Sequence, residues 1–143
     1  MIVCDANALY IAYDRSEPRH QLVVAALRAE RQARLLSPFV LAEVDYLLAT
    51  RLGVIVEDQL LADVEDGVYQ LCAFETDDVR AARSLVSTYK DLNIGLADAS
   101  NVVLAHRYST TNILTFDERH FRALRPLSGV ESFTLLPLDA TGG

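Results

Sequence analysis

The stretch that decides the fold lies at residues 2–13 and reads IVCDANALYIAY. Its first three residues are apolar, which is typical of a short buried strand, and Asp5 follows them directly. Asp often ends a strand or begins a helix, because its side chain accepts hydrogen bonds from nearby backbone N–H groups. In α/β proteins, however, the carboxyl ends of the strands also border the ligand site. Asp5 alone does not decide between these two roles.

Outward from this stretch, the chain alternates between strands and helices. We expect strands at 2–5, 34–38, 69–75, 112–116 and 132–137. We expect helices at 6–13, 18–33, 39–52, 57–67, 77–90, 95–108 and 119–124. This alternation predicts an α/β fold with a central, mainly parallel β-sheet that helices cover on both faces.

The composition is that of a globular chain, and we expect one domain over residues 1–143. A hydrophobic content of 51% with 23% charged residues excludes an intrinsically disordered protein. No apolar run has the length of a membrane span, and no secretory signal begins the sequence, so we expect no membrane partner and a cytoplasmic location. Cys4 and Cys72 fall in predicted strands and are expected to be core residues, not disulfide or zinc ligands.

The net charge of −7 argues by itself against a nucleic-acid partner, because contacts with phosphates normally need a basic surface. Two groups of arginines could still hold phosphates. One group contains Arg15, and the other follows residue 117 and contains Arg119. The commoner role of such side chains is to solvate a helix face, so they are weak candidates for substrate binding.

Three acidic residues occupy positions that are unusual for solvent-exposed side chains, two at strand ends and one in a mostly apolar helix. Asp117 follows the 112–116 strand just as Asp5 follows the first strand, so the two should meet at one edge of a parallel sheet. Asp98 is the single charged residue in IGLADASNVVLA, residues 94–105. A helix that is apolar nearly all round is mostly buried, and a buried carboxylate needs a hydrogen-bonding partner, an ion pair or a metal. The alternative for each is a cap at the start of a helix.

A fourth carboxylate comes from SPFVLAEVDYLLATRLG, residues 37–53, where the choice stays open. Glu43 and Asp45 flank the apolar stripe of this helix on opposite sides, and the periodicity does not choose between them. Several acids without a matching Lys or His favour a hard cation, Mg²⁺ or Mn²⁺. Two such ions about 3.5–4 Å apart are a common device for the in-line hydrolysis of phosphodiesters. We assign no catalytic histidine.

Four motifs in this order resemble the PIN-domain ribonucleases, and more narrowly the VapC toxins of bacterial toxin–antitoxin pairs. They are VCDANAL, LAEVDYLL, LADASNVVLA and ILTFDERHF. The resemblance places the four acids of the family's site on Asp5, Glu43, Asp98 and Asp117, and so selects Glu43 over Asp45. It also places supporting polar residues on Asn7 and Thr115.

The resemblance implies a PIN-like three-layer sandwich and a Mg²⁺- or Mn²⁺-dependent endoribonuclease that acts as a toxin. It implies cleavage of RNA by two-metal-type in-line hydrolysis, a VapB-type antitoxin that covers the pocket, and a homodimer. One alternative is a PIN-fold module that binds RNA or protein without cleaving. Another is a metal-dependent phosphatase with an Asp nucleophile, although the second Asp that such enzymes carry two positions after the first is missing after Asp5.

Overall fold

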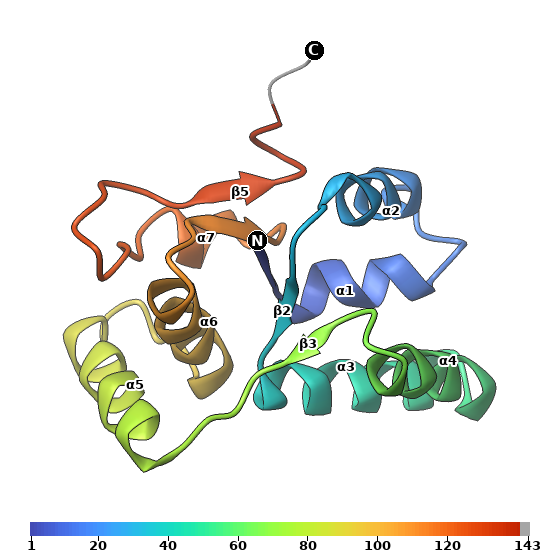
Figure 1. Ribbon diagram of the computed structural model, residues 1–143, viewed down its shortest axis with the longest axis horizontal. Coiled ribbons are helices and arrows are strands. Elements are labelled where there is room, and N and C mark those ends of the chain that lie inside the picture. The colour runs from blue at the N-terminus through green and yellow to red at the C-terminus, as the bar shows by residue number, and fades with distance from the viewer. Residues whose placement is uncertain (141–143) are drawn as a thin grey trace.

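A five-stranded, wholly parallel sheet forms the centre of the described residues, which are residues 1–140 of the computed structural model (Figure 1). The strands are β1 (Ile2–Cys4), β2 (Arg34–Leu36), β3 (Gln70–Leu71), β4 (Asn112–Leu114) and β5 (Thr134–Leu136). Their order across the sheet is β3-β2-β1-β4-β5, and every neighbouring pair is parallel. The expected α/β class with a central parallel sheet is therefore confirmed.

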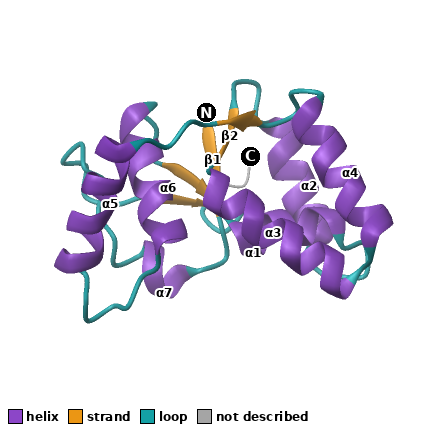
Figure 2. Ribbon diagram, turned by 90° about the horizontal axis from the view of Figure 1, so that it is seen from below, coloured by secondary structure: helices purple, strands orange, loops and turns teal. Residues whose placement is uncertain are grey.

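Helices cover both faces of this sheet, which gives three layers (Figures 1 and 2). The helices are α1 (Ala6–Tyr13), α2 (His20–Ala29), α3 (Pro38–Arg51), α4 (Val54–Glu65), α5 (Thr76–Thr88), α6 (Leu96–Arg107) and α7 (Glu118–Phe121). Helices α1 to α4 lie on one side, and α5 and α6 lie on the other. None of the helices in residues 1–140 is both long and apolar enough to cross a membrane.

Strand β1 separates two apolar cores, because successive side chains of a strand point to opposite faces. Ile2 and Cys4 pack in the core beneath α1 to α4, whereas Val3 packs in the core beneath α5 and α6. All three side chains are fully buried. A continuous apolar run is what a parallel strand with two covered faces requires.

The direction in which strands are added reverses between β1 and β4. Strands β2 and β3 extend the sheet on one side of β1, whereas β4 and β5 extend it on the other. Cys4 pairs with Leu114 in the register, so Asp5 and Thr115 emerge side by side at the carboxyl ends of these two strands. Such a reversal opens the crevice in which α/β sheets place ligands.

Several element ends differ from those expected, for local reasons. Strand β3 has two residues, and the buried Cys72 follows it instead of lying within it. Helix α5 begins at Thr76, one residue before the expected start at 77, because Glu75 forms a capping box with Asp78. Pro38 is the first residue of α3 and does not end a strand, because Pro suits the first helical position.

We predict that Leu104→Ala lowers the free energy of unfolding by about 2–5 kcal/mol, because it leaves a cavity between α6 and the sheet. Leu104 is fully buried, whereas Leu96 on the same helix is 42% exposed. Leu96→Ala should therefore cost less than about 1 kcal/mol. Urea unfolding of both variants checks the difference, and equal losses would contradict the assigned burial.

Candidate functional site

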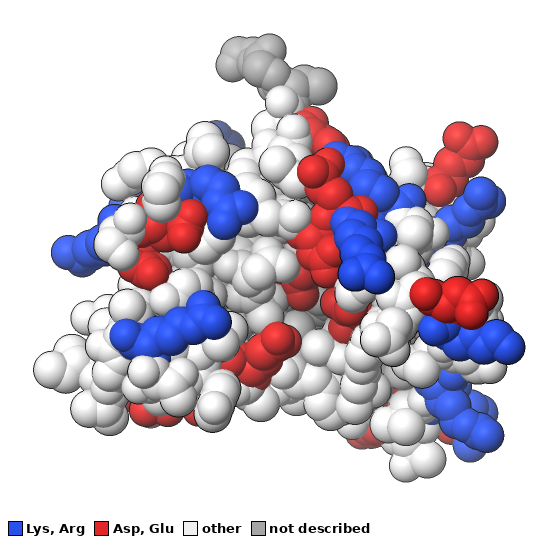
Figure 3. Space-filling view, turned by 180° about the vertical axis from the view of Figure 1, so that it is seen from behind, with Lys and Arg blue, Asp and Glu red and all other residues white. Residues whose placement is uncertain are grey.

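A pocket of about 450 Å³ lies at the carboxyl ends of β1 and β4. Its lining residues are Asp5, Ala6, Asn7, Glu43, Leu47, Gly95, Leu96, Ala97, Asp98, Asp117 and His120. The structure thus brings together the four acids expected from the sequence, which come from the end of β1, from α3, from α6 and from the end of β4. The face of the molecule in Figure 3 shows acidic side chains beside a central hollow, with basic side chains close to them.

Asp5 is buried and is held by side chains from three parts of the chain. The Thr115 hydroxyl donates to Asp5 Oδ2 at 2.7 Å, and Asn7 Nδ2 donates to the same oxygen at 3.0 Å. Asn101 Nδ2, from α6, donates to Asp5 Oδ1 at 3.2 Å. The Asp5 side chain makes no capping hydrogen bond to α1. Its position is therefore not explained by the helix cap that a sequence alone would suggest.

Asn7 and Thr115 also connect Asp5 with the segment that carries Asp117. Asn7 Oδ1 accepts from the Phe116 backbone N–H at 3.0 Å. Thr115 Oγ1 accepts from the Asp117 backbone N–H at 3.0 Å. Each of these side chains therefore contacts Asp5 and fixes the chain that leads into Asp117.

Burial raises the pKa of Asp5 to about 7. The Thr115 hydrogen bond opposes this rise, and the negative charge of Asp98 adds to it. Burial also raises the pKa of Asp98, against the effect of His120, and it raises the pKa of Glu43 with a further contribution from Asp98. The three carboxyls therefore take up a proton more readily than they would in water, and a positive charge among them would oppose this.

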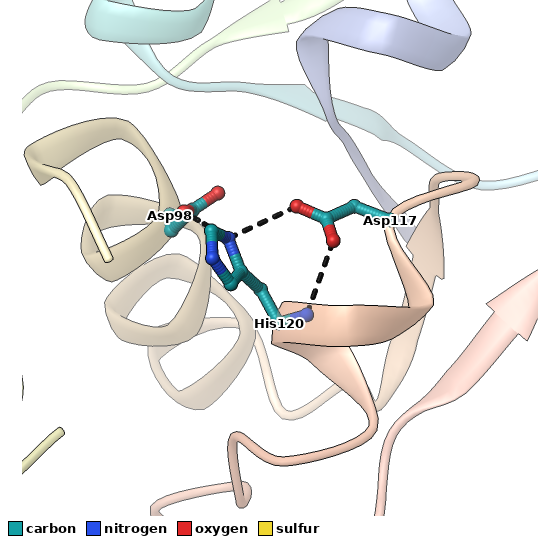
Figure 4. A group of neighbouring side chains, drawn as sticks. All are labelled: Asp98, Asp117 and His120. Carbon is teal, nitrogen blue, oxygen red and sulfur yellow. Dashed lines mark hydrogen bonds and ion pairs between the residues drawn. The ribbon is translucent and has the colours of Figure 1, made fainter. Parts of the chain in front are cut away.

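Asp98 and Asp117 face each other across His120 (Figure 4). His120 Nδ1 lies 2.9 Å from Asp98 Oδ2 and 3.0 Å from Asp117 Oδ2. Asp117 Oδ1 also accepts from the His120 backbone N–H at 3.1 Å, so Asp117 does cap α7 while its other oxygen lines the pocket. Gly95 is the residue at the cap of α6, and Asp98 lies three residues further on, inside the first turn.

Glu43 lines the pocket, whereas Asp45 lies elsewhere. The Asp45 carboxyl lies close to Glu57 of the neighbouring helix α4, and this proximity raises the pKa of Glu57. Helix α3 is also fixed against α6, because the buried hydroxyls of Ser37 and Ser100 lie 2.7 Å apart. That contact joins the start of the helix that bears Glu43 to the helix that bears Asp98.

The two arginines suggested by the sequence do not line this pocket. Arg15 lines two other clefts beside α1 and α4, and Arg119 is exposed on α7. Arg19 contacts Phe116, the residue before Asp117, and its guanidinium carbon lies 4.3 Å from the centre of that ring. A positive group stacked on an aromatic ring in this way is attracted by the ring's negative face.

The sequence interpretation assigned no role in the site to two residues, His120 and Asn101. Both lie three positions after an assigned acid, His120 after Asp117 and Asn101 after Asp98. Side chains three apart share a helix face, and this spacing was the available signal. Asn101 is fully buried, and its Oδ1 has no hydrogen-bonding partner within residues 1–140.

The lining residues suit a divalent cation. Carboxylate oxygens are the ligands that Mg²⁺ and Mn²⁺ prefer, and no Lys or Arg is among the residues described around the pocket. One ligand atom each from Asp98, Asp117 and His120 lie within 4.8 Å of one another. Without a cation, neighbouring carboxylates in this pocket raise one another's pKa. A bound cation would remove that repulsion.

Two known proteins are similar to this chain. Ribonuclease VapC26 of Mycobacterium tuberculosis (strain H37Rv) is 43% identical to this chain over 136 residues, which is 95% of this chain and 100% of the relative. The crystal structure of VapC20 from Mycobacterium tuberculosis, described as a sarcin–ricin loop cleaving toxin, superposes with a TM-score of 0.76. That match has 18% sequence identity and covers 82% of this chain and 90% of the other, so it shows the fold alone.

No protein-family model matches the chain. The identity to VapC26 over almost the whole length nevertheless shows the family, and the fold agrees with that of VapC20. The chain belongs to the VapC family of PIN-domain ribonucleases.

Proposed function

We propose that this protein is a divalent-cation-dependent endoribonuclease that serves as the toxin of a toxin–antitoxin pair. The observation that carries the proposal is the gathering of four acids from separate elements into one pocket at the reversal of the strand order. Its relative VapC26 is named a ribonuclease, and VapC20 is described as cleaving the sarcin–ricin loop.

In this proposal Asp5, Glu43, Asp98 and Asp117 hold Mg²⁺ or Mn²⁺. When bound, such cations lower the pKa of a water molecule and stabilise the leaving oxygen of a phosphodiester. Asn7 and Thr115 orient the Asp5 carboxylate, since both donate to its Oδ2. Asp5 can then present its charge without rotating, which is the usual role of hydrogen bonds behind a metal ligand.

The proposal includes protein partners as well as RNA. We expect a VapB-type antitoxin and a homodimer. Large apolar side chains are exposed on α3 and at the start of α4, with Tyr46 67%, Val54 72% and Ile55 75% exposed. A group of exposed apolar residues supports a protein-binding surface in this region. Sedimentation velocity of the purified chain tests the dimer, and co-purification with the product of the adjacent gene tests the antitoxin.

Glu43→Gln and Asp98→Asn should each lower the rate of RNA cleavage by about 100-fold or more, because each removes a charge from the cation site. Asp45→Asn is the matched control, since it lies on the same helix as Glu43 but contacts α4. The measurement is cleavage of total cellular RNA with and without Mg²⁺ or Mn²⁺, with sequencing of the 5′-phosphate ends. Equal cleavage by all variants would refute the assigned site.

Metal-free protein should become less stable as the pH rises from about 4 to about 7. The folded state keeps the Asp5 proton up to a pKa of about 7, whereas the unfolded chain releases it near 3.8, so the folded state loses this advantage across that range. At pH 8 in a chelator, Asp5→Asn should therefore raise the free energy of unfolding by on the order of 2 kcal/mol.

This gain should shrink as the pH is lowered towards 4, because the unmodified carboxyl is then protonated. An amide at this position can donate to Asn101 Oδ1, which has no other partner, once the Asn101 amide turns over. Thermal unfolding at several pH values measures the difference. A loss of stability that is the same at every pH would contradict the assigned cost of the buried charge. Added Mn²⁺ should stabilise the unmodified protein more than the variant.

Arg19→Gln should raise KM for RNA by about three- to tenfold with little change in kcat, because the guanidinium that is stacked on Phe116 lies beside the strand end that bears Asp117. The dependence of KM on salt should also weaken. Arg15→Gln is the control, since Arg15 lines other clefts. Steady-state kinetics on a labelled RNA at two salt concentrations checks this. The same KM for both variants would exclude a specific role of Arg19.

A further inference from the structure

We propose that His120 binds the divalent cation directly through Nδ1, so that the site is a mixed nitrogen–oxygen site that favours Mn²⁺ over Mg²⁺. The inference rests on the proposed metal-dependent function and deepens it, since it names a ligand and the resulting choice of ion. The resemblance and the sequence pattern pointed to an all-carboxylate site and to no histidine.

The distances around His120 match those within a coordination shell. Two ligand atoms at adjacent corners of an octahedron, each about 2.1 Å from the ion, lie about 3 Å apart. Nδ1 of His120 is 2.9 Å from Asp98 Oδ2 and 3.0 Å from Asp117 Oδ2. The imidazole nitrogen and the two carboxylate oxygens are therefore already spaced as three ligands of one ion (Figure 4).

The orientation of the ring leaves Nδ1 available. The atom is buried, yet neither carboxylate oxygen is aligned with it well enough to form a hydrogen bond. Nδ1 lies within ion-pair distance of both carboxylates but meets the geometry of a hydrogen bond to neither, so the three atoms are placed to share one cation. An ion that lies between the three side chains would also neutralise the two carboxylates.

The chain holds this ring in place from its own backbone. Asp117 Oδ1 accepts from the His120 backbone N–H at 3.1 Å, so the first turn of α7 fixes the two residues relative to each other. The His120 side chain is 19% exposed, compared with 17% for Asp98 and 27% for Asp117. All three are sheltered to a similar degree at the wall of the same pocket.

The chemical consequence is a preference among ions. Mg²⁺ favours oxygen ligands and retains much of its water, whereas imidazole nitrogen suits the later first-row metals better. One nitrogen among carboxylates should therefore strengthen the binding of Mn²⁺, and of Co²⁺ still more, while it does little for Mg²⁺. A site that used the four carboxylates alone would show a smaller difference between Mn²⁺ and Mg²⁺.

The test is metal binding to the purified chain after removal of metal by a chelator. Electron paramagnetic resonance measures free Mn²⁺ during titration, and competition gives the Kd for Mg²⁺. His120→Gln should raise the Kd for Mn²⁺ about tenfold or more and change the Kd for Mg²⁺ by less than about threefold. His106→Gln is the matched control, because His106 is exposed at the end of α6 and lies outside the pocket. It should leave both constants unchanged.

A second measurement needs no substitution. Pulsed electron paramagnetic resonance of the Mn²⁺-loaded, unmodified chain should show the coupling of a directly bound nitrogen. Growth with ¹⁵N-histidine should change that coupling to the ¹⁵N pattern. His120→Gln should abolish it, and His106→Gln should keep it. Mn²⁺ bound without a nitrogen coupling, or a coupling that survives in His120→Gln, would overturn the inference.

RNA cleavage by the same samples separates this inference from the proposed function. Nitrogen-coupled Mn²⁺ without any cleavage would leave the ligand assignment standing and would overturn the nuclease proposal. Metal-dependent cleavage with no nitrogen coupling would leave the nuclease proposal standing and would overturn the ligand assignment. If neither Mn²⁺ nor Mg²⁺ bound to the chain, both the ligand assignment and the nuclease proposal would be overturned.

Discussion

The buried carboxylate of Asp5 is the constraint on which the rest of this structure depends. A carboxylate away from water is stable only if other groups bond to it. Thr115, Asn7 and Asn101 supply those bonds, and they come from the end of β4, the first turn of α1 and the middle of α6. Satisfying one side chain therefore fixes three elements relative to the first strand.

The same arrangement places several carboxyl groups close together, so that they repel one another when they are charged. Burial and the neighbouring acids raise the pKa of Asp5, Asp98 and Glu43. The pocket is therefore least stable when all of its carboxyls are charged and no cation is bound. The two apolar cores on either side of β1 supply the stability that holds these groups together. A binding site built at the cost of local stability is a common compromise in proteins.

Helix α6 contributes both to the packing of the apolar core and to the polar contacts of the site. Its buried apolar residues pack against the sheet, while Asp98, Ser100 and Asn101 turn polar atoms toward three different neighbours. Ser100 reaches α3 through Ser37, Asn101 reaches Asp5, and Asp98 lines the pocket beside His120. Polar residues in an otherwise apolar helix are thus positioned by the partners they meet, because leaving a buried polar group unpaired costs free energy.

The sequence by itself determined the alternation of strands and helices, the parallel sheet and the placing of Asp5 and Asp117 at strand ends, since these follow from local periodicity and from the way parallel sheets are built. Only the tertiary structure decided that Asn101 and Thr115, 96 and 110 residues away from Asp5, bond to it. It also placed Asp45 against α4 and His120 between two acids. The physical reason is that periodicity states which face of an element is buried, whereas the partner of a polar side chain depends on how separate elements pack.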